Sequence, residues 1–393
     1  MLSRGAGTRK QLVVLLATTG AGLALVAAGP TGSAGAAPTT CQGQPVTIVA
    51  TAGSSTVQGT EGPDVIDGAG RSSLTILGLG GDDVICSGAG TSVTIDGGDG
   101  DDELLFVGDG DGEGRGGEGD DRLVDATTYD LNSVTMIPGP GDDTVVGHDR
   151  VTRLVFGGTA GVRILAADGI ADGEGHDTFT GIRRFVGTGA SDTFVGSESD
   201  DSFRGGPETD GSTPSGAPDV AFGGGGSDFL ELVGRAEGGE GSDGLRVHGP
   251  NASASGGPGS DRLLLFPGFA CTSACRVSAD GGAGVDRVTL NPEYGGVRVN
   301  LSSGRASMGA SGRASLVNVE DVVGTWYRDV IIGNARRNRL YGEGGRDVLR
   351  GRAGADKLYG ANGRDVLVGG GGRDRAVGGL DRDRCQAEVR RSC

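Results

Sequence analysis

The sequence predicts an all-β protein, built as a parallel β-roll or β-solenoid of stacked coils that are rich in glycine and aspartate. Three observations favour this fold class. Glycine supplies 82 of the 393 residues and aromatic residues only 4%, so a conventional large core is not expected. Aliphatic residues recur at regular intervals between the glycines, which argues against a disordered linker. The glycines also lack the Gly-X-Y period of collagen.

The clearest repeat lies near the C-terminus, in residues 329–385. Seven acidic or amide residues follow one another at intervals of nine, and an aliphatic residue or a cysteine stands two positions after each. One unit reads Gly-Gly-x-Gly-x-Asp-x-aliphatic-x. The seven residues are Asp329, Asn338, Asp347, Asp356, Asp365, Asp374 and Asp383.

Each part of this unit has a physical task. Glycine permits the positive φ of a tight turn, aspartate presents a hard oxygen ligand, and the aliphatic side chain points inward from a very short strand. A single unit cannot bury its one apolar side chain, whereas stacked units can. We therefore expect consecutive strands to lie on opposite sheets, with two units forming one coil of about 18 residues.

This nonapeptide resembles the repeat of the RTX, or hemolysin-type, calcium-binding family of secreted bacterial proteins. The resemblance implies a parallel β-roll with calcium ions between the turns of adjacent coils, held by aspartate carboxylates and by backbone carbonyls. Asn338 lacks a charge, so a site there is expected to be weaker. The alternative, in which each aspartate only caps its own turn, does not explain why all seven units share one phase. The implied ligands are Asp329, Asp347, Asp365 and Asp383 on one edge, and Asp356 and Asp374 on the other.

Residues 37–150 form an N-terminal repeat block with a longer period. Four aspartates in glycine-rich turns recur at a constant interval of nineteen positions, and a fifth lies in a related turn farther on. One full coil plus one residue explains this interval, so only one edge of the block is predicted to bind calcium. The five predicted ligands are Asp64, Asp83, Asp102, Asp121 and Asp143.

The middle of the chain, residues 151–295, is predicted to be an irregular β-solenoid because its aspartate turns are unevenly spaced. Inserted loops are expected at 207–218 and at 271–275. Related aspartates in this region are Asp177, Asp192, Asp201, Asp228, Asp243, Asp261 and Asp286.

A longer duplication overlies these repeats. Residues 179–194 match residues 316–331 at a constant offset, which indicates two related modules. Residues 296–328 resemble the lead-in that precedes RTX repeat blocks. Residues 386–393 form a tail after the last repeat.

The N-terminus predicts export. Arg4, Arg9 and Lys10 precede an apolar run and the small residues Ala34-Gly35-Ala36, so residues 1–36 are predicted to be a signal peptide. A retained signal anchor is the alternative, but the run is short and broken by glycine. The predicted location of the mature chain is therefore extracellular, with no membrane span. The whole chain has a formal net charge of −17. Such a negative charge suits cations as ligands and argues against nucleic acid as a partner.

Six cysteines in an exported chain are expected to be oxidised, and six cysteines allow 15 pairings. Proximity in the sequence favours three pairs: Cys41 with Cys86, Cys271 with Cys275, and Cys385 with Cys393. Two of these bridges are expected to cover the open ends of the solenoid, where the last apolar layer would otherwise be exposed.

No catalytic constellation is found in the sequence, so the chain is predicted not to be an enzyme. His148, His176 and His248 do not form a His-Glu-x-x-His motif. We instead expect a secreted structural or surface-interaction module that folds on binding extracellular calcium, with a cell-surface glycan or acidic envelope polymer as a further partner. The alternative is a calcium-dependent polysaccharide lyase or epimerase on a β-helix, although the single lysine after residue 36 and the single tryptophan do not favour a sugar-binding groove.

Overall fold

The computed structural model describes residues 40–90, 92–108, 110–127, 133–148, 151–206, 216–268, 275–292, 295–309 and 312–393. Within these ranges the secondary structure consists of short β-strands, without an α-helix. Accordingly, no helix in the described part has the length and hydrophobicity to span a membrane. The predicted signal peptide lies outside the described residues, as do Cys271 and most of the predicted loop at 207–218.

The N-terminal block begins with a short antiparallel hairpin and continues with a series of strands of two to seven residues. The hairpin consists of β1 (Thr40–Cys41) and β2 (Gln44–Pro45). The strands that follow are β3 (Ile48–Val49), β4 (Thr56–Gln58), β5 (Val65–Asp67), β6 (Leu74–Gly80), β7 (Val84–Cys86), β8 (Val93–Asp99), β9 (Glu103–Gly108), β10 (Gly112–Glu118), β11 (Arg122–Thr127), β12 (Val134–Ile137), β13 (Thr144–Val146) and β14 (Thr152–Val155).

The middle region contains strands of very different length. They are β15 (Arg163–Leu165), β16 (Ile170–Asp172), β17 (His176–Thr180), β18 (Arg184–Val186), β19 (Thr193–Val195), β20 (Ser202–Arg204), β21 (Asp219–Gly225), β22 (Phe229–Glu240), β23 (Gly244–Gly259), β24 (Arg262–Phe266), β25 (Arg276–Gly284) and β26 (Arg287–Leu290). The two longest, β22 and β23, continue through a turn and therefore pair with neighbours in both sheets.

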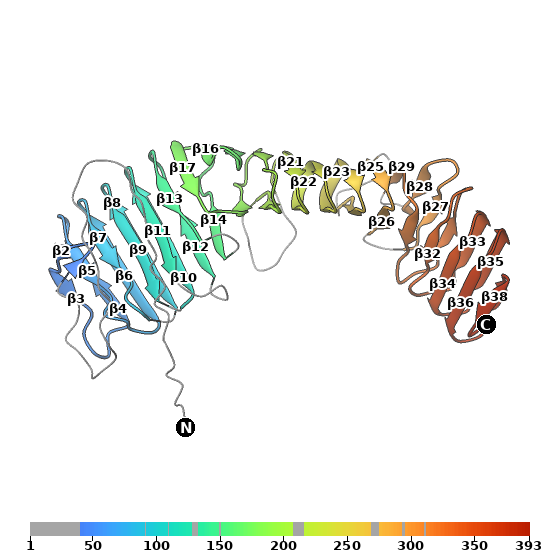
Figure 1. Cartoon of the computed structure of the whole chain (residues 1–393), viewed down its shortest axis with the longest axis horizontal. Helices are drawn as coiled ribbons and strands as arrows, with labels where there is room; N and C mark the ends of the chain where they lie inside the picture. The colour runs from blue at the N-terminus through green and yellow to red at the C-terminus, as the bar shows by residue number, and fades with distance from the viewer. Residues whose placement is uncertain are drawn as a thin grey trace, which may run out of the picture. The chain divides into compact units, whose positions relative to one another are not determined.

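The C-terminal strands are again short and regular (Figure 1). They are β27 (Arg298–Asn300), β28 (Arg305–Ser307), β29 (Arg313–Val317), β30 (Asp321–Val323), β31 (Val330–Ile332), β32 (Arg339–Tyr341), β33 (Val348–Ala353), β34 (Lys357–Asn362), β35 (Val366–Gly371), β36 (Arg375–Leu380), β37 (Arg384–Gln386) and β38 (Val389–Arg391).

In both repeat blocks most strands pair in parallel with the strand two places along the chain. Strands β5, β7, β9, β11 and β13 belong to what we call the first sheet, and β6, β8, β10, β12 and β14 to the second sheet. At the C-terminus β31, β33, β35 and β37 continue the first sheet, and β30, β32, β34, β36 and β38 the second. The predicted parallel roll, with consecutive strands on opposite sheets, is confirmed.

The register gives the length of each coil. Val65 pairs with Val84, so a coil of the N-terminal block spans nineteen positions, and Val330 pairs with Val348, so a C-terminal coil spans eighteen. Both lengths agree with the periods in the sequence. In the middle region the pairing runs from Ser202 through Phe229 and onward to Arg287, and its coils vary from fifteen to twenty-seven positions.

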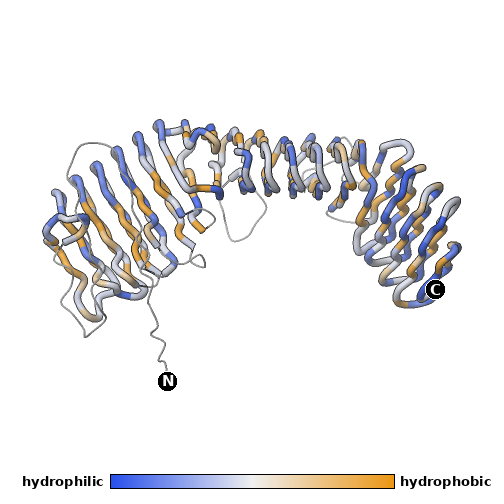
Figure 2. Tube along the Cα trace, viewed as in Figure 1, coloured by the Kyte–Doolittle hydropathy of each residue, from blue (hydrophilic) through white to orange (hydrophobic). Residues whose placement is uncertain are grey.

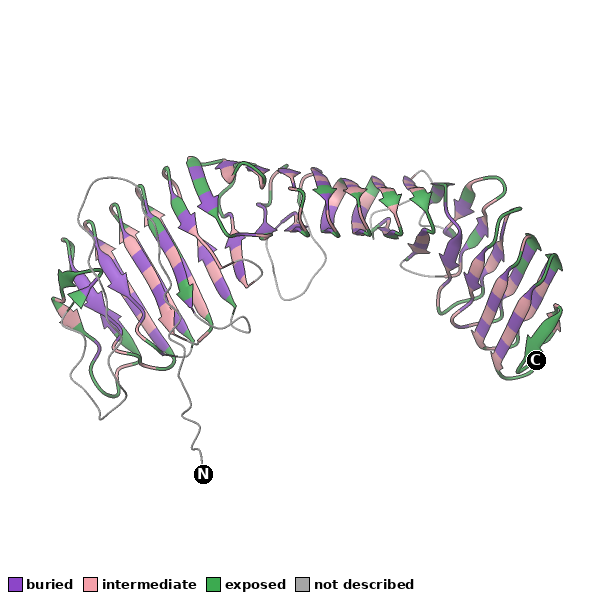
Figure 3. Cartoon of the chain, viewed as in Figure 1, coloured by how far each residue is buried: buried purple, intermediate pink, exposed green. Residues whose placement is uncertain are grey.

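The core is a row of inward-facing side chains between the sheets. At the C-terminus each strand contributes one fully buried apolar side chain: Ile331, Leu340, Leu349, Leu358, Leu367 and Ala376. In the middle region Phe179, Phe185, Phe194 and Phe203 form a stack with ring centroids 4.8–5.4 Å apart. Hydrophobic and buried positions therefore lie along the strands, and the turns are polar and more exposed (Figures 2 and 3).

Two antiparallel inserts interrupt the parallel stacking. Strands β15, β16 and β17 form one three-stranded meander, and β27, β28 and β29 form the other. In each case the first strand of the insert then pairs in parallel with a strand of the following coil, β19 or β31. The duplication predicted from the sequence therefore corresponds to a repeated structural unit.

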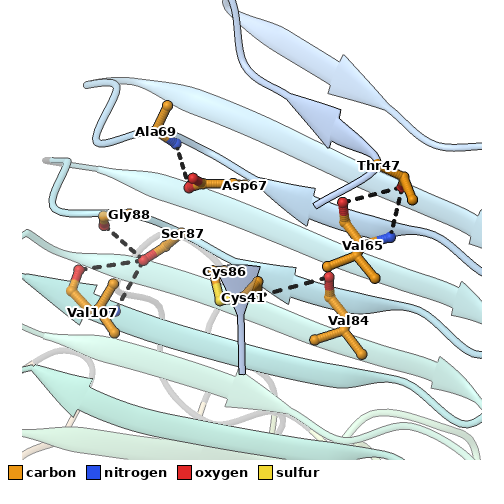
Figure 4. The surroundings of a disulfide bond; sticks show 10 residues. All are labelled: Cys41, Thr47, Val65, Asp67, Ala69, Val84, Cys86, Ser87, Gly88 and Val107. Atoms are coloured by element: carbon orange, nitrogen blue, oxygen red, sulfur yellow. Dashed lines mark hydrogen bonds between the residues drawn. A yellow bond between two sulfur atoms is a disulfide. The ribbon is translucent and has the colours of Figure 1, made fainter. Parts of the chain in front are cut away.

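The disulfide between Cys41 and Cys86 does not cover the end of the solenoid. Ile85 points into the core, so Cys86 on the same strand faces outward. Cys41 packs there against Val65 and Val84, and the bond holds the β1–β2 hairpin on the outer face of the first sheet (Figure 4). The expectation for this end was wrong because it ignored the alternation of side chains along a strand.

The second disulfide, between Cys385 and Cys393, closes the last coil. Cys385 packs partly against the core, as expected for the inward position of the last repeat. The tail is itself a strand, since β38 pairs in parallel with β36. Cys275 is also disulfide-bonded, and its predicted partner lies outside the described residues.

Candidate metal-binding turns

Successive aspartates on an edge of the solenoid are linked through their side chains. The backbone N–H of Asp64 donates to Oδ1 of Asp83, and the N–H of Asp83 donates to Oδ1 of Asp102, both at 2.8 Å. Each aspartate therefore uses one carboxylate oxygen to bind the turn of the preceding coil. We call a series linked in this way an aspartate row.

The described chain contains five such rows. Rows one, two and four lie on the first edge, where the turns lead into the first sheet, and rows three and five lie on the second edge. Row one is Asp64, Asp83, Asp102, Asp121, Asp143 and Asp177; row two is Asp192 and Asp219; row three is Asp201, Asp228, Asp243, Asp261 and Asp286; row four is Asp329, Asp347, Asp365 and Asp383; row five is Asn338, Asp356 and Asp374.

The second carboxylate oxygen has no partner at most positions. In 13 of the row aspartates the Oδ2 atom is buried and makes no hydrogen bond within the described chain. Burying a carboxylate oxygen without a partner is costly, so a repeated arrangement of this kind points to a series of cation-binding sites. The 13 are Asp83, Asp102, Asp121, Asp143, Asp228, Asp243, Asp261, Asp286, Asp347, Asp356, Asp365, Asp374 and Asp383.

A glycine five positions earlier makes room for this oxygen at all of these aspartates except Asp143, where Pro138 stands instead. A Cβ atom added to Gly97 would overlap Oδ2 of Asp102 and approach the carbonyl oxygen of the next coil. Gly360 stands in the same relation to Asp365. This glycine is required for space rather than for backbone freedom, since neither of the two has a positive φ.

Burial raises the pKa of several row carboxyls, Asp102, Asp121 and Asp347 among them, far above that of an ordinary aspartate. Desolvation raises the pKa of Asp102 to about 7 and that of Asp121 and Asp347 to about 8, while hydrogen bonds from the preceding aspartate act in the opposite direction. Repulsion from neighbouring row carboxylates raises these pKa values further. A divalent cation would remove both penalties.

The ligands of such a cation cannot all be side chains. Among the described residues, no group of three or more His, Cys, Asp or Glu side chains is placed to hold a metal. Calcium takes six to eight oxygen ligands and accepts backbone carbonyls. The row carboxylates and the carbonyls of the glycine-rich turns fit calcium, and a site made only of side chains does not.

All eleven aspartates predicted as calcium ligands lie in rows one, four and five. Two of them differ from the rest, because the Oδ2 atoms of Asp64 and Asp329 accept hydrogen bonds from Thr60 and Thr325. Asn338 donates through Nδ2 to the backbone carbonyl of the preceding coil at 2.9 Å, so its amide links two turns without a cation. The expectation of a weaker site at Asn338 stays a prediction.

Sequence reasoning missed row three as a set of candidate ligands. Asp228, Asp243, Asp261 and Asp286 have the same linked Oδ1 and unpartnered Oδ2 as the predicted ligands. Their uneven spacing hid the shared phase. The local signal, a glycine five positions before each aspartate, was nevertheless present.

Two glutamates that sequence reasoning also missed end rows on the second edge. Oε2 of Glu320 accepts the N–H of Asp286 at 3.2 Å, and Oε2 of Glu388 accepts the N–H of Asp374 at 2.7 Å. Each carboxylate replaces the Oδ1 of an aspartate that the next coil lacks. Glu388 is out of phase with the nonapeptides, so the repeat pattern gave no signal for it. Glu320 stands nine positions before Asp329, with the buried Val322 two positions after it, so the period reached it although it is not an aspartate.

The fold and these turns define a class of parallel β-roll proteins with metal-binding edges. The family described as RTX calcium-binding nonapeptide repeat (4 copies) matches residues 47–70, 75–93, 185–210, 323–358 and 350–385. A search of curated proteins found no significant match. The chain contains RTX-type calcium-binding repeats, as predicted, and these support an RTX-type repeat protein. The matched segments include parts of rows one to five but not Asp228, Asp243, Asp261 or Asp286.

A single methyl group should disturb one turn. In Gly360→Ala the new Cβ would overlap Oδ2 of Asp365 and crowd the carbonyl of Gly378, so we expect a loss of about 1–3 kcal/mol in unfolding free energy. Urea unfolding in calcium measures this loss. The matched control is Gly62→Ala, where the methyl group meets no atom within 4 Å. Equal stabilities of the two variants would contradict the role of Gly360 in leaving space for Oδ2 of Asp365.

Calcium binding should depend on pH well above the range of ordinary carboxylates. The raised pKa values of Asp102, Asp121 and Asp347 place their deprotonation between about pH 7 and 8. Metal-free coils are therefore relatively more stable at pH 5 and lose this stability as pH rises, whereas calcium requires the deprotonated form. We expect the calcium concentration at half-saturation to increase at least tenfold from pH 8 to pH 5.5. Titration followed by circular dichroism measures it, and a constant midpoint contradicts the pKa assignment.

Proposed function

We propose that this chain is a secreted structural module that completes its folding when it binds extracellular calcium. The observation that carries the proposal is the set of 13 buried, unpartnered Oδ2 atoms in rows between successive coils. Calcium, when bound, would supply positive charge and additional coordination at these oxygens. The chain's own residues hold the carboxylates in place through the N–H to Oδ1 bonds, and the glycines keep the space around Oδ2 clear.

The energetic argument is a balance between a small core and a costly edge. Each C-terminal strand buries only one apolar side chain, such as Leu349 or Leu358, so every coil gains little from apolar burial. Ordering the glycine-rich turns costs conformational entropy, and adjacent row carboxylates repel one another. Binding energy at the turns is therefore folding energy.

Export is supported by three features. Residues 1–36 have the composition of a signal peptide. Disulfide bonds link Cys41 with Cys86 and Cys385 with Cys393, and such bonds persist in oxidising compartments outside the cytosol. RTX repeats are also typical of secreted bacterial proteins. Calcium is plentiful outside cells and scarce inside, so folding would follow export.

A structural rather than catalytic role is supported by the family, since RTX repeat regions are typically not enzymatic. The chain devotes its buried polar groups to links between coils. Glu231, for example, has its carboxylate within hydrogen-bond distance of Arg246, at 3.1 Å, and 3.4 Å from His248 on the neighbouring strand.

The outer face of the second sheet near the C-terminus is the surface we propose for an acidic envelope polymer. Arg339, Lys357 and Arg375 are aligned on adjacent parallel strands. Beside them the rings of Tyr341 and Tyr359 stack 4.8 Å apart. Aligned cations next to aromatic rings suit a repeating anionic chain that runs across the strands.

The central prediction is a calcium-specific gain in structure. We expect the full chain to gain β-sheet signal in circular dichroism and to melt at least about 10 °C higher in millimolar calcium than in chelator, because metal binding offsets carboxylate repulsion. Magnesium should have a much smaller effect, since it dehydrates reluctantly and demands a stricter geometry. Asp347→Asn should reduce the gain, and the exposed Asp168→Asn serves as its control. No difference between calcium and chelator would refute the proposed function.

Binding of an acidic polymer should depend on the outer face. We expect the triple variant Arg339→Ala, Lys357→Ala and Arg375→Ala to elute from an immobilised acidic polysaccharide at clearly lower salt than the wild-type protein. The control variant Arg346→Ala, Arg364→Ala and Arg382→Ala removes the same charge from exposed positions on the first edge. If both variants elute together, net charge rather than this face determines retention.

A further inference from the structure

The first turn of every aspartate row differs from the turns that follow it. At Asp64 the carboxylate oxygen Oδ2 accepts the backbone N–H of Thr60 at 2.8 Å and the Thr60 hydroxyl at 2.9 Å. The oxygen that is unpartnered in 13 later turns is here satisfied by the chain itself. We call such a turn capped, and a turn with an unpartnered Oδ2 open.

The same cap recurs at the start of rows two, three and four. Oδ2 of Asp192 accepts the N–H of Thr188 at 2.7 Å, and Oδ2 of Asp201 accepts both the N–H and the hydroxyl of Ser197 at 2.7 and 2.8 Å. At Asp329 the N–H of Thr325 donates to Oδ2 at 2.6 Å. The capping residue always stands four positions before the aspartate.

Row five begins with an all-amide version of this cap. The N–H of Asn334 donates to Oδ1 of Asn338 at 2.9 Å. Asn338 also binds the preceding coil through its Nδ2. The first turn of each of the five rows is therefore closed by a residue four positions earlier.

The backbone separates the two kinds of turn. In open turns the residue four before the aspartate has a positive φ, for example 71° at Glu343, 83° at Arg352 and 72° at Ala361. The threonine and serine caps are not among the residues with positive φ. A β-branched residue such as threonine is strained at positive φ, so the residue type selects the turn.

This difference redirects one N–H group. In the open turn of Asp121 the N–H of Gly117 donates to the carbonyl of Pro138 in the next coil at 3.1 Å. In a capped turn the corresponding N–H points at the row carboxylate instead. A cation near that carboxylate would then face hydrogen-bond donors, which repel it.

We infer that the capping hydroxyl and amide take the place of calcium, so that capped turns are metal-free and fold first. The inference rests on the proposed calcium-dependent folding. Each row thus begins on a coil that is complete without metal, because no aspartate turn of that row precedes it to share an ion. Open turns can then add to it as calcium becomes available. The residue four before the aspartate determines which turns bind the ion.

The test converts an open turn into a capped one. Glu343→Thr with Gly345→Ala gives the turn of Asp347 the sequence Thr-Gly-Ala found at Thr188-Gly189-Ala190. The matched control Glu343→Gly removes the same charge but keeps an open turn. Native mass spectrometry of the full chain counts bound calcium, and thermal unfolding in chelator measures stability without metal.

We expect the exchanged variant, Glu343→Thr with Gly345→Ala, to bind one calcium ion fewer than the Glu343→Gly control. In chelator we expect it to melt at a higher temperature than this control. Arg352→Thr with Gly354→Ala places the same two residue types at the turn of Asp356 on the opposite edge. An unchanged calcium count in a folded variant overturns the inference, as does failure of both exchanged variants to fold in calcium, since a self-sufficient turn must fold. A wild-type chain that binds no calcium would instead refute the proposed function.

Discussion

The hydrogen bond from the backbone N–H of one aspartate to Oδ1 of the next is the interaction on which the edges of this protein depend. It fixes the distance between turns at the strand spacing and orients every carboxylate in the same way. As a result the second oxygen of 13 of these aspartates is buried in its turn without a hydrogen-bond partner. The affinity for calcium is thus a by-product of how the coils are joined, and the same contact provides both the register and the ligand.

This arrangement also explains how so thin a core can be sufficient. Leu349, Leu358 and Leu367 each contribute one buried side chain to the interior, so stability is a sum of small terms between adjacent coils. The two-sided C-terminal block has rows on both edges, the N-terminal block has one on its first edge, and most of the middle region has one on its second edge. The Phe179–Phe203 stack lies where row one ends and rows two and three begin, and larger side chains there add apolar burial.

Much of this could be predicted from the sequence, because a strict period translates directly into a register. The two regular spacings gave the coil lengths and the predicted ligands Asp83 and Asp347. Row three was not predicted as a set of ligands because loops of varying length interrupt its period. Its successive coils are nevertheless joined by the same N–H to Oδ1 hydrogen bond. The position of Cys86 was misjudged, since proximity in sequence does not say which face of a strand a side chain occupies. Thr60 and Thr325 were visible in the sequence, but only the direction of their N–H groups shows what they do.

The two antiparallel inserts have a consequence for how such chains change in length. The last strand of each insert pairs with the preceding strand of the first sheet, and the first strand of the insert pairs with the following strand of the first sheet. The insert therefore leaves the alternation of the two sheets unchanged on both sides. A segment bounded by equivalent inserts can therefore be duplicated or deleted as a cassette, and the flanking coils still find partners of the right register. Growth by whole cassettes preserves the fold, whereas gain or loss of a single strand would move every following strand to the opposite sheet.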